Sequence, residues 1–195
     1  MNEGFVSRYI NRHFSRPLAG LLTHKPVTPN QVTVASFTVA LGAAVAFVEG
    51  ASALGGILAQ VSSILDGTDG DLARVQGTAT PFGSFFDAVL DRYADAAIVL
   101  GMVLSIHETH ANAWMVGLAA LLGSLMVSYT QARAETSVGV RFRTGLGALA
   151  TRDVRLILVC LGGVAGQVFW TLAALAVLTN FSVLARILFA YRVVK

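Results

Sequence analysis

Four aspartates stand at helical spacing in one stretch of a strongly apolar chain. The segment DGTDGDLARVQGTATPFGSFFDAVLD runs from position 66 to position 91 and contains Asp66, Asp69, Asp87 and Asp91. A carboxylate at membrane depth is costly unless another group compensates its charge, so an acid kept in such surroundings indicates a functional site by default. These four acids therefore mark the first place to look for chemistry.

The spacing within each pair indicates how the carboxylates meet. Asp66 and Asp69 are three residues apart, and Asp87 and Asp91 are four apart, so each pair shares one face of a helix. The intervening RVQGTATPFG contains two glycines and a proline, which favour a short connection between antiparallel helices. The two pairs are therefore predicted to face each other.

Charge repulsion indicates what such a cluster must bind. Two carboxylates about 5 Å apart at an effective dielectric near 20 repel by roughly 3 kcal/mol, so protons or cations must accompany them. All-oxygen clusters suit hard divalent ions such as Mg²⁺ or Mn²⁺, and four aspartates can bridge two of them, as phosphoryl transfer requires. A salt-bridge network inside the membrane is the structural alternative.

The chain resembles the CDP-alcohol phosphotransferase family at this point. The family pattern D-x2-D-G-x2-A-R-x8-G-x3-D-x3-D is matched without a departure by Asp66, Asp69, Gly70, Ala73, Arg74, Gly83, Asp87 and Asp91. The resemblance implies a six-helix membrane enzyme that displaces CMP from a CDP-alcohol with the hydroxyl of a second alcohol. It also implies that the four aspartates hold two metal ions and that Asp91 is the catalytic base.

The other motif residues have the chemistry that a CDP-alcohol site needs. Arg74 offers a planar fork of donors for diphosphate oxygens. Gly70 and Gly83 leave room for a nucleotide near the helix backbone, although helix packing through small residues is the alternative for each glycine taken singly. The CDP-binding set implied by the motif and by the Pro-Asn element of KPVTPNQVT comprises Asn30, Thr33, Asp66, Asp69, Gly70, Ala73, Arg74 and Gly83.

Three arginines are candidates for the phosphate of the acceptor. Arg133 lies in SYTQARAE, near the end of the predicted fourth span, and Arg152 and Arg155 lie one turn apart in TRDVRL. Resemblance to the branch that makes di-myo-inositol phosphate phosphate or phosphatidylinositol phosphate favours an inositol phosphate as a substrate. Glycerol 3-phosphate is an alternative acceptor, and an anchor for lipid phosphates is the bland interpretation, which suffices for Arg141 and Arg143 in the loop between.

Composition places these motifs in a polytopic membrane protein. Hydrophobic residues make up 55% of the chain and charged residues 13%, with a mean hydropathy of +0.68. We expect an all-α integral membrane protein, one domain over residues 1–195, with a juxtamembrane helix in 1–25 and a six-helix bundle in 26–195. The predicted spans are 31–49, 51–66, 86–106, 113–130, 152–165 and 168–191.

The segment before the first span predicts an amphipathic helix in the membrane interface. It sets Phe5, Ile10, Phe14, Leu18 and Leu22 against Arg8, Arg12 and Arg16. Packing of this helix on the bundle is a compatible alternative. Thr28 before Pro29 predicts the N-cap of the first span.

The basic residues predict the orientation and exclude other classes. With the N-terminus inside, every Lys and Arg falls at cytoplasmic ends or loops, so we expect a cell-membrane protein whose active site faces the cytoplasm. The net charge of +3 indicates attraction to anionic lipid headgroups and phosphates, so a nucleic-acid partner is not needed to explain it. A cation carrier would have acids distributed along a path toward both membrane faces, whereas the acids of this chain crowd at one end. Cys160 is the single cysteine, so no disulfide forms within the chain.

Two partners complete the expectation. We expect a homodimer in the bilayer, bound to a CDP-alcohol donor and a polar alcohol acceptor. Members of the di-myo-inositol branch often carry a cytidylyltransferase domain upstream, and the 195 residues contain none. A separate cytidylyltransferase is therefore the expected partner.

Overall fold

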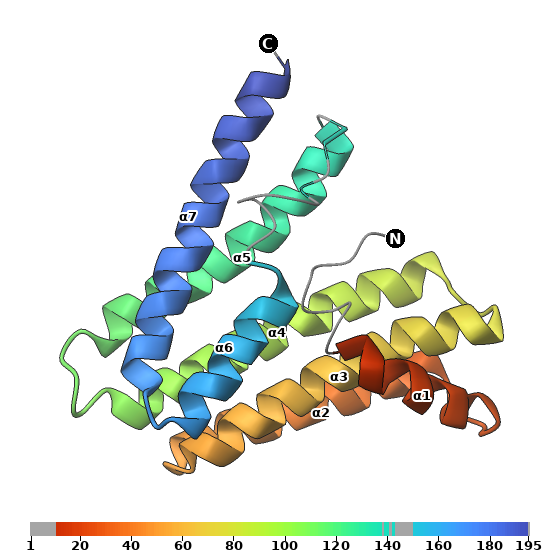
Figure 1. Cartoon of the computed structure of the whole chain (residues 1–195), viewed down its shortest axis with the longest axis horizontal. Coiled ribbons are helices and arrows are strands. Elements are labelled where there is room, and N and C mark those ends of the chain that lie inside the picture. The colour runs from red at the N-terminus through yellow and green to blue at the C-terminus, as the bar shows by residue number, and fades with distance from the viewer. Residues whose placement is uncertain (1–10, 138, 141, 143–149, 195) are drawn as a thin grey trace.

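The computed structural model describes residues 11–137, 139–140, 142 and 150–194. In this part of the chain the regular structure is helical, and Figure 1 shows the arrangement. The helices are α1 (Arg12–Thr23), α2 (Pro29–Val48), α3 (Ser52–Gln76), α4 (Pro81–Ile106), α5 (Ala113–Ser137), α6 (Arg152–Val164) and α7 (Val168–Val194). The helix α6, predicted to be short, has 13 residues.

The two helices that carry the aspartates are longer than the apolar runs predicted. The run expected to end at 66 continues as α3 to Gln76, and the helix expected from 86 starts at Pro81. Polar motif residues are therefore helical, because tertiary contacts rather than hydropathy extend these helices. The Asp69, Gly70 and Arg74 positions consequently share one regular helix with Asp66.

Local signals define the ends of these helices. Thr28 caps α2 through a capping box with Gln31, as the sequence predicted for Thr28. Gly77 ends α3 in the left-handed conformation, with a φ of 66°, and Thr80 caps α4 by accepting from the Gly83 backbone N–H. The connection is thus only residues 77–80, and it reverses the chain between α3 and α4.

Close backbone contacts hold the helices that surround the aspartates. The helix α2 packs against both α3 and α4, and α6 packs against α3. A Cβ placed on Gly101 of α4 would lie 2.5 Å from the Ala44 carbonyl oxygen of α2, and one placed on Gly163 of α6 would lie 2.6 Å from the Ser52 carbonyl oxygen of α3. Glycine is therefore required at both crossings. The core between them contains Phe47, Ile98 and Met102.

The last helix and α5 form a second group. They pack side by side and diverge from the α2–α3–α4 group toward their C-terminal ends (Figure 1). The helix α6 joins the two groups, since it contacts α3 and also α7. The first residues of α6 are consequently brought to the region where the groups meet.

The helix α1 packs on α3 through small and polar residues, and packing on the bundle was one of the two compatible expectations for this helix. Asn11, Ser15 and Ala19 are buried, whereas Phe14 of the predicted apolar stripe is exposed. Hydrogen bonds to acids of the bundle favour the polar face, because these groups need partners when buried. Three of the residues on which that stripe was predicted, Phe5, Arg8 and Ile10, lie outside the described residues.

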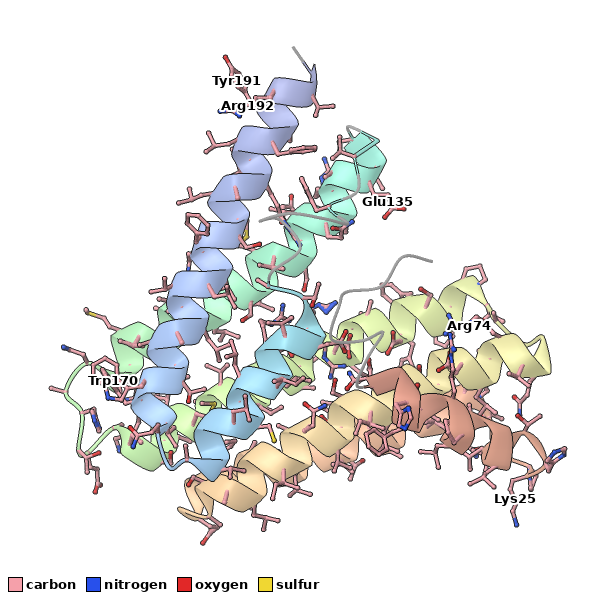
Figure 2. All side chains as sticks on the ribbon, viewed as in Figure 1. Lys25, Arg74, Glu135, Trp170, Tyr191 and Arg192 are labelled. Atoms are coloured by element: carbon pink, nitrogen blue, oxygen red, sulfur yellow. The ribbon has the colours of Figure 1, made fainter. Side chains whose placement is uncertain are left out.

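Three of the described helices are long and apolar enough to span a membrane by length and composition: Pro29–Val48, Ala113–Ser137 and the first 26 residues of α7. The aspartates and basic residues of α3 and α4 lower the apolar content of those helices, and α6 is short. Lys25, Arg74, Glu135 and Arg192 lie at helix ends remote from Trp170 (Figure 2). These four charged residues thus lie away from the α6–α7 turn that Trp170 adjoins.

Candidate active site

Three of the four predicted metal ligands come together between α3 and α4. Asp66 of α3 and Asp87 and Asp91 of α4 each offer a carboxylate oxygen, and these oxygens all lie within 4.8 Å of one another. The two helices run antiparallel across the four-residue connection 77–80, so their aspartate faces meet. This is the juxtaposition that the spacing predicted.

The fourth aspartate lies toward a neighbouring cavity. Asp69 accepts a short hydrogen bond from the Thr33 hydroxyl, which fixes one of its carboxylate oxygens against α2. It is buried and lines the same cavity as Asp87. The four carboxylates are therefore neighbours, from Asp91 through Asp66 and Asp87 to Asp69, and Asp69 is hydrogen-bonded to Thr33.

The cavity beside the carboxylates has a volume of about 520 Å³. Its walls come from the start of α2, the end of α3, the 77–80 connection and the first turns of α4. The residues predicted to bind CDP that line it are Asn30, Thr33, Asp69, Gly70, Ala73, Arg74 and Gly83. Asp66, also in that predicted set, lines a smaller adjoining cavity with Thr33, Asp91 and Arg152 instead.

The glycines of the motif differ in what surrounds them. A Cβ on Gly70 would lie 3.6 Å from the nearest atom, the Arg74 Nη2, so protein packing does not require glycine there. A Cβ on Gly83 would lie 3.1 Å from the Thr80 hydroxyl and 3.3 Å from Asn30 Oδ1. Gly83 therefore lets α4 approach the start of α2, while Gly70 keeps open space in the cavity.

A single arginine of α6 reaches the carboxylate group. Arg152 Nη1 lies 2.8 Å from Asp66 Oδ2 and 2.9 Å from Asp91 Oδ1. Its Nε lies 3.5 Å from Asp95 Oδ1. Arg92 Nη1 also lies 3.7 Å from Asp91 Oδ2. Because two guanidiniums face the three carboxylates of Asp66, Asp87 and Asp91, the group keeps an excess of negative charge that favours a bound cation.

A second arginine lies one turn further along α6 in a buried ion pair. Arg155 Nη2 lies 2.5 Å from Asp95 Oδ2, and Arg155 Nη1 donates to the Ala150 carbonyl at 2.9 Å. Both side chains are 4% exposed. Asp95 continues the Asp87–Asp91 face by one turn, where its spacing allows either a pair with Arg92 or support of the site. The structure places its carboxylate between Arg152 and Arg155.

The third predicted acceptor residue is separate from these two. Arg133 is exposed near the end of α5. Arg141 and Arg143 lie outside the described residues. The structure therefore brings Arg152 to the aspartates, places Arg155 behind it and leaves Arg133 on the surface.

The donor set of the carboxylate group fits a hard divalent cation. All the candidate ligand atoms are carboxylate oxygens. Asp87 Oδ1 is buried and makes no hydrogen bond to any group in the described part of the chain. A buried carboxylate oxygen without a partner is costly, and a cation bound by oxygen ligands would satisfy it.

Asp71 belongs to the site although sequence reasoning passed over it. It accepts from the Ser15 hydroxyl at 2.8 Å and from Arg74 Nη2 at 2.6 Å, one turn away. The signal was present in the sequence, because the spacing of three to Arg74 allows an ion pair on one helix face. The family pattern fixes Asp69 and Gly70 but leaves position 71 open, so the pattern does not identify Asp71 as a site residue.

Comparison with known proteins agrees with this geometry. Residues 26–181 match the family model of CDP-alcohol phosphatidyltransferase. The bifunctional IPC transferase and DIPP synthase of Rubrobacter xylanophilus is 46% identical over 190 residues, which cover 96% of this chain and 42% of that protein. The archaetidylinositol phosphate synthase of Methanothermobacter thermautotrophicus is 30% identical, covering 100% of this chain and 98% of that protein.

A solved structure is also similar. The crystal structure of phosphatidylinositol phosphate synthase from Mycobacterium tuberculosis, in complex with manganese and citrate, has a TM-score of 0.78 at 27% identity, covering 91% of this chain and 88% of that one. A structure of that enzyme with CDP-DAG bound has a TM-score of 0.77 at 26% identity, covering 92% of this chain and 94% of that one. The chain spans less than half the length of the bifunctional relatives from Rubrobacter xylanophilus and Aquifex aeolicus.

Proposed function

Because this chain belongs to the CDP-alcohol phosphatidyltransferase family, we propose that it transfers a substituted phosphate group from a CDP-alcohol to the hydroxyl of a second alcohol and releases CMP. One observation carries the proposal above the others. The motif residues line a cavity of about 520 Å³ that adjoins the carboxylate group, so a nucleotide and a cation site lie next to each other.

The cavity supplies the donor site in this proposal. Asn30, Thr33, Gly70, Ala73 and Gly83 surround the nucleotide, with Asp66 and Asp69 at the end nearest the cation site. Arg74, 41% exposed and lining the cavity, donates to the diphosphate. The open space beside Gly70 supports close approach of the nucleotide to α3.

The aspartates hold two divalent ions in this proposal, Mg²⁺ or Mn²⁺. Asp66, Asp69, Asp87 and Asp91 supply the ligands, and the buried, unbonded oxygen of Asp87 supports that role. When bound, such ions neutralise charge on the diphosphate and on the attacking and leaving oxygens. The manganese in the mycobacterial structure is consistent with a cation of this class.

Asp91 accepts the proton of the acceptor hydroxyl in the proposed reaction. The acceptor oxygen forms a new bond to the β-phosphorus of the CDP-alcohol, the bond from that phosphorus to CMP breaks, and CMP leaves. Asp91 lines the smaller cavity with Arg152, and this cavity has no room for an acceptor molecule. In this proposal the acceptor therefore approaches the carboxylate group from the larger cavity, where Asp91 lies beside Asp87.

The acceptor in this proposal is an inositol phosphate. The relatives named above include synthases of archaetidylinositol phosphate and phosphatidylinositol phosphate, and Arg152 lies beside the proposed base. Arg133 and Arg155 complete the proposed phosphate site. Because two N–H groups of Arg155 already bind Asp95 and Ala150, a phosphate would use its remaining donors.

The location and assembly are also proposed. We place all six of α2–α7 in the cell membrane, α1 in its interface, and the site at the cytoplasmic face, on the distribution of basic residues. A homodimer and a separate cytidylyltransferase are proposed partners. A carrier of cations would have no use for the motif-lined cavity beside its acids, which favours the enzyme.

Product analysis tests the proposal and both substrates at once. Purified protein is incubated with radiolabelled CDP-diacylglycerol, CDP-archaeol or CDP-inositol and, in turn, with inositol 1-phosphate or glycerol 3-phosphate. We expect CMP release and a new phosphodiester with inositol 1-phosphate. A product only with glycerol 3-phosphate would replace the proposed acceptor, and no product with any pair would refute the transferase.

A further inference from the structure

Polar side chains hold α1 on the bundle. The row Asn11, Ser15 and Ala19 faces α3 and is at most 2% exposed. Asn11 Nδ2 donates to Ser63 Oγ at 2.8 Å and to Asp153 Oδ1 at 2.6 Å. These bonds fix the position of α1 against both α3 and the start of α6.

The next residue in that row begins a chain of contacts that ends in the cavity. Ser15 is fully buried, and its hydroxyl donates to Asp71 Oδ2 at 2.8 Å. The other oxygen of the same carboxylate accepts from Arg74 Nη2 at 2.6 Å. Arg74 in turn lines the cavity, at the end of α3 nearest the α3–α4 connection (Figure 2).

We propose that Asp71 and Ser15 are positioning residues for the donor diphosphate: Asp71 fixes the guanidinium of Arg74, and Ser15 of α1 fixes Asp71. The inference rests on the proposed function, because it needs a diphosphate in the cavity. It extends that function by making α1, which lies outside the motif, a part of the donor site.

Burial and exposure support positioning over simple packing. Asp71 is 7% exposed, and a carboxylate is costly to bury where an apolar side chain would pack as well. Arg74 is 41% exposed, so without a partner its long side chain would sample many rotamers. Holding Nη2 on Asp71 fixes the plane of the rigid guanidinium fork at the wall of the cavity.

The two effects of Asp71 on binding have opposite signs. Its negative charge weakens the attraction of Arg74 for phosphate. Its hydrogen bond, in contrast, orders Arg74 before the ligand arrives, so less side-chain entropy is lost on binding. Ordering a long side chain at a binding site reduces affinity by up to about tenfold. We expect ordering to win, because solvent around the half-exposed Arg74 guanidinium screens part of the effect of the Asp71 charge.

A double-mutant cycle with Asp71→Asn and Arg74→Ala tests the inference. The readout is the dissociation constant of CDP, which carries the cytidine and diphosphate of every CDP-alcohol, measured by calorimetry with Mg²⁺ on the full chain. We expect Asp71→Asn to weaken CDP binding about tenfold in the wild-type background and less than about twofold beside Arg74→Ala. Ser15→Ala should weaken binding in the same direction by a smaller factor.

Matched controls and contrary outcomes keep the test decisive. Ser124→Ala removes another buried serine hydroxyl, in α5, and should leave CDP binding unchanged. Tighter CDP binding by Asp71→Asn, or an equal loss in both backgrounds, would overturn the inference while leaving the proposed function intact. Failure of the wild-type protein to bind CDP would overturn both. If Asp71→Asn does not fold, Ser15→Ala takes its place in the cycle.

Discussion

Asp91 and Asp87 lie one turn apart on α4 but face different spaces. Asp87 lines the large cavity with Asp69, whereas Asp91 lines the smaller one with Arg152. A carboxylate that faces away from the nucleotide can accept a proton from an acceptor without contacting the donor's base or ribose. The different positions of Asp87 and Asp91 therefore support the proposal that Asp91, and not Asp87, accepts the proton.

The substitution Asp91→Asn tests that division. It should reduce turnover by more than about a hundredfold, since a general base contributes on that order, and should change CDP-alcohol affinity only slightly. CMP release and calorimetry with a CDP-alcohol measure the two effects separately. Near-normal turnover would remove Asp91 from the role of base.

The arginines separate donor from acceptor in the same way. Arg74→Ala should lower turnover with every acceptor, because its proposed partner is the diphosphate common to all reactions. Arg152→Ala should instead raise the Michaelis constant for the acceptor by about tenfold or more, the effect of losing a charge-assisted contact. Steady-state kinetics with each substrate varied in turn distinguishes the two. If the acceptor dependence of Arg152→Ala matches the wild type, Arg152 serves only the aspartates.

At the scale of elements, the crossing of α3 and α6 determines where Arg152 lies. Arg152 is the first residue of α6, and Gly163 near the other end packs on Ser52 and Gly56 of α3. A side chain at Gly163 would press on backbone atoms, which cannot rotate aside. A shift of α6 would then move Arg152 away from Asp66 and Asp91.

The substitution Gly163→Val should therefore lower both the melting temperature and activity. Its Cβ would lie 2.6 Å from the Ser52 carbonyl oxygen, and overpacking of this kind costs about 1–3 kcal/mol. The matched control is Gly42→Ala in α2, whose Cβ would meet only Leu58 Cδ1 at 3.9 Å. The control should keep or slightly raise the melting temperature, and equal behaviour of the two variants would contradict this account of the crossing.

The sequence predicted the helices well because their signals are local. Thr28 caps α2 as predicted, and Gly77 and Pro81, which the sequence placed in the connection, are where α3 ends and α4 begins. The lengths of α3 and α4 were underestimated, because hydropathy stops at the aspartates whereas the helices continue. The aspartate pairs were placed correctly, since spacing on a helix determines which residues share a face.

Contacts between distant helices could not be predicted in the same way. Asp95 was left undecided because its partner Arg155 is 60 residues away in the sequence. The partners of α1 were out of reach for the same reason. Asn11 and Ser15 find theirs on α3 and α6, and a stripe of apolar residues on α1 does not reveal such contacts.

At the scale of the whole molecule, the distribution of basic residues indicates how the protein is oriented across the membrane. Lys25 and Arg74 lie near the cavity, whereas the turn between α4 and α5 carries Thr109 and neighbouring histidines and no Lys or Arg. The positive-inside rule supports the proposed placement of the cavity at the cytoplasmic face. CDP-alcohols and phosphorylated polyols would reach the site from that side.

Cysteine labelling tests this orientation. In a Cys160→Ala background, Thr109→Cys should react with an impermeant maleimide in intact cells, and Lys25→Cys should react only after the membrane is opened. Both positions are exposed in the structure, so access rather than burial decides the result. The reverse pattern would put the aspartates at the outer face.

The central claim is that the carboxylate group works with divalent cations in transfer from a CDP-alcohol. Release of CMP, with donor and acceptor both saturating, is the most direct measurement, made after exhaustive chelation and again after Mg²⁺ or Mn²⁺ is restored. The account predicts no release above background in chelator and recovery with either ion. It also predicts a lower melting temperature without metal, because Arg152 then compensates only part of the repulsion among Asp66, Asp87 and Asp91. Undiminished CMP release after complete removal of divalent ions would contradict it.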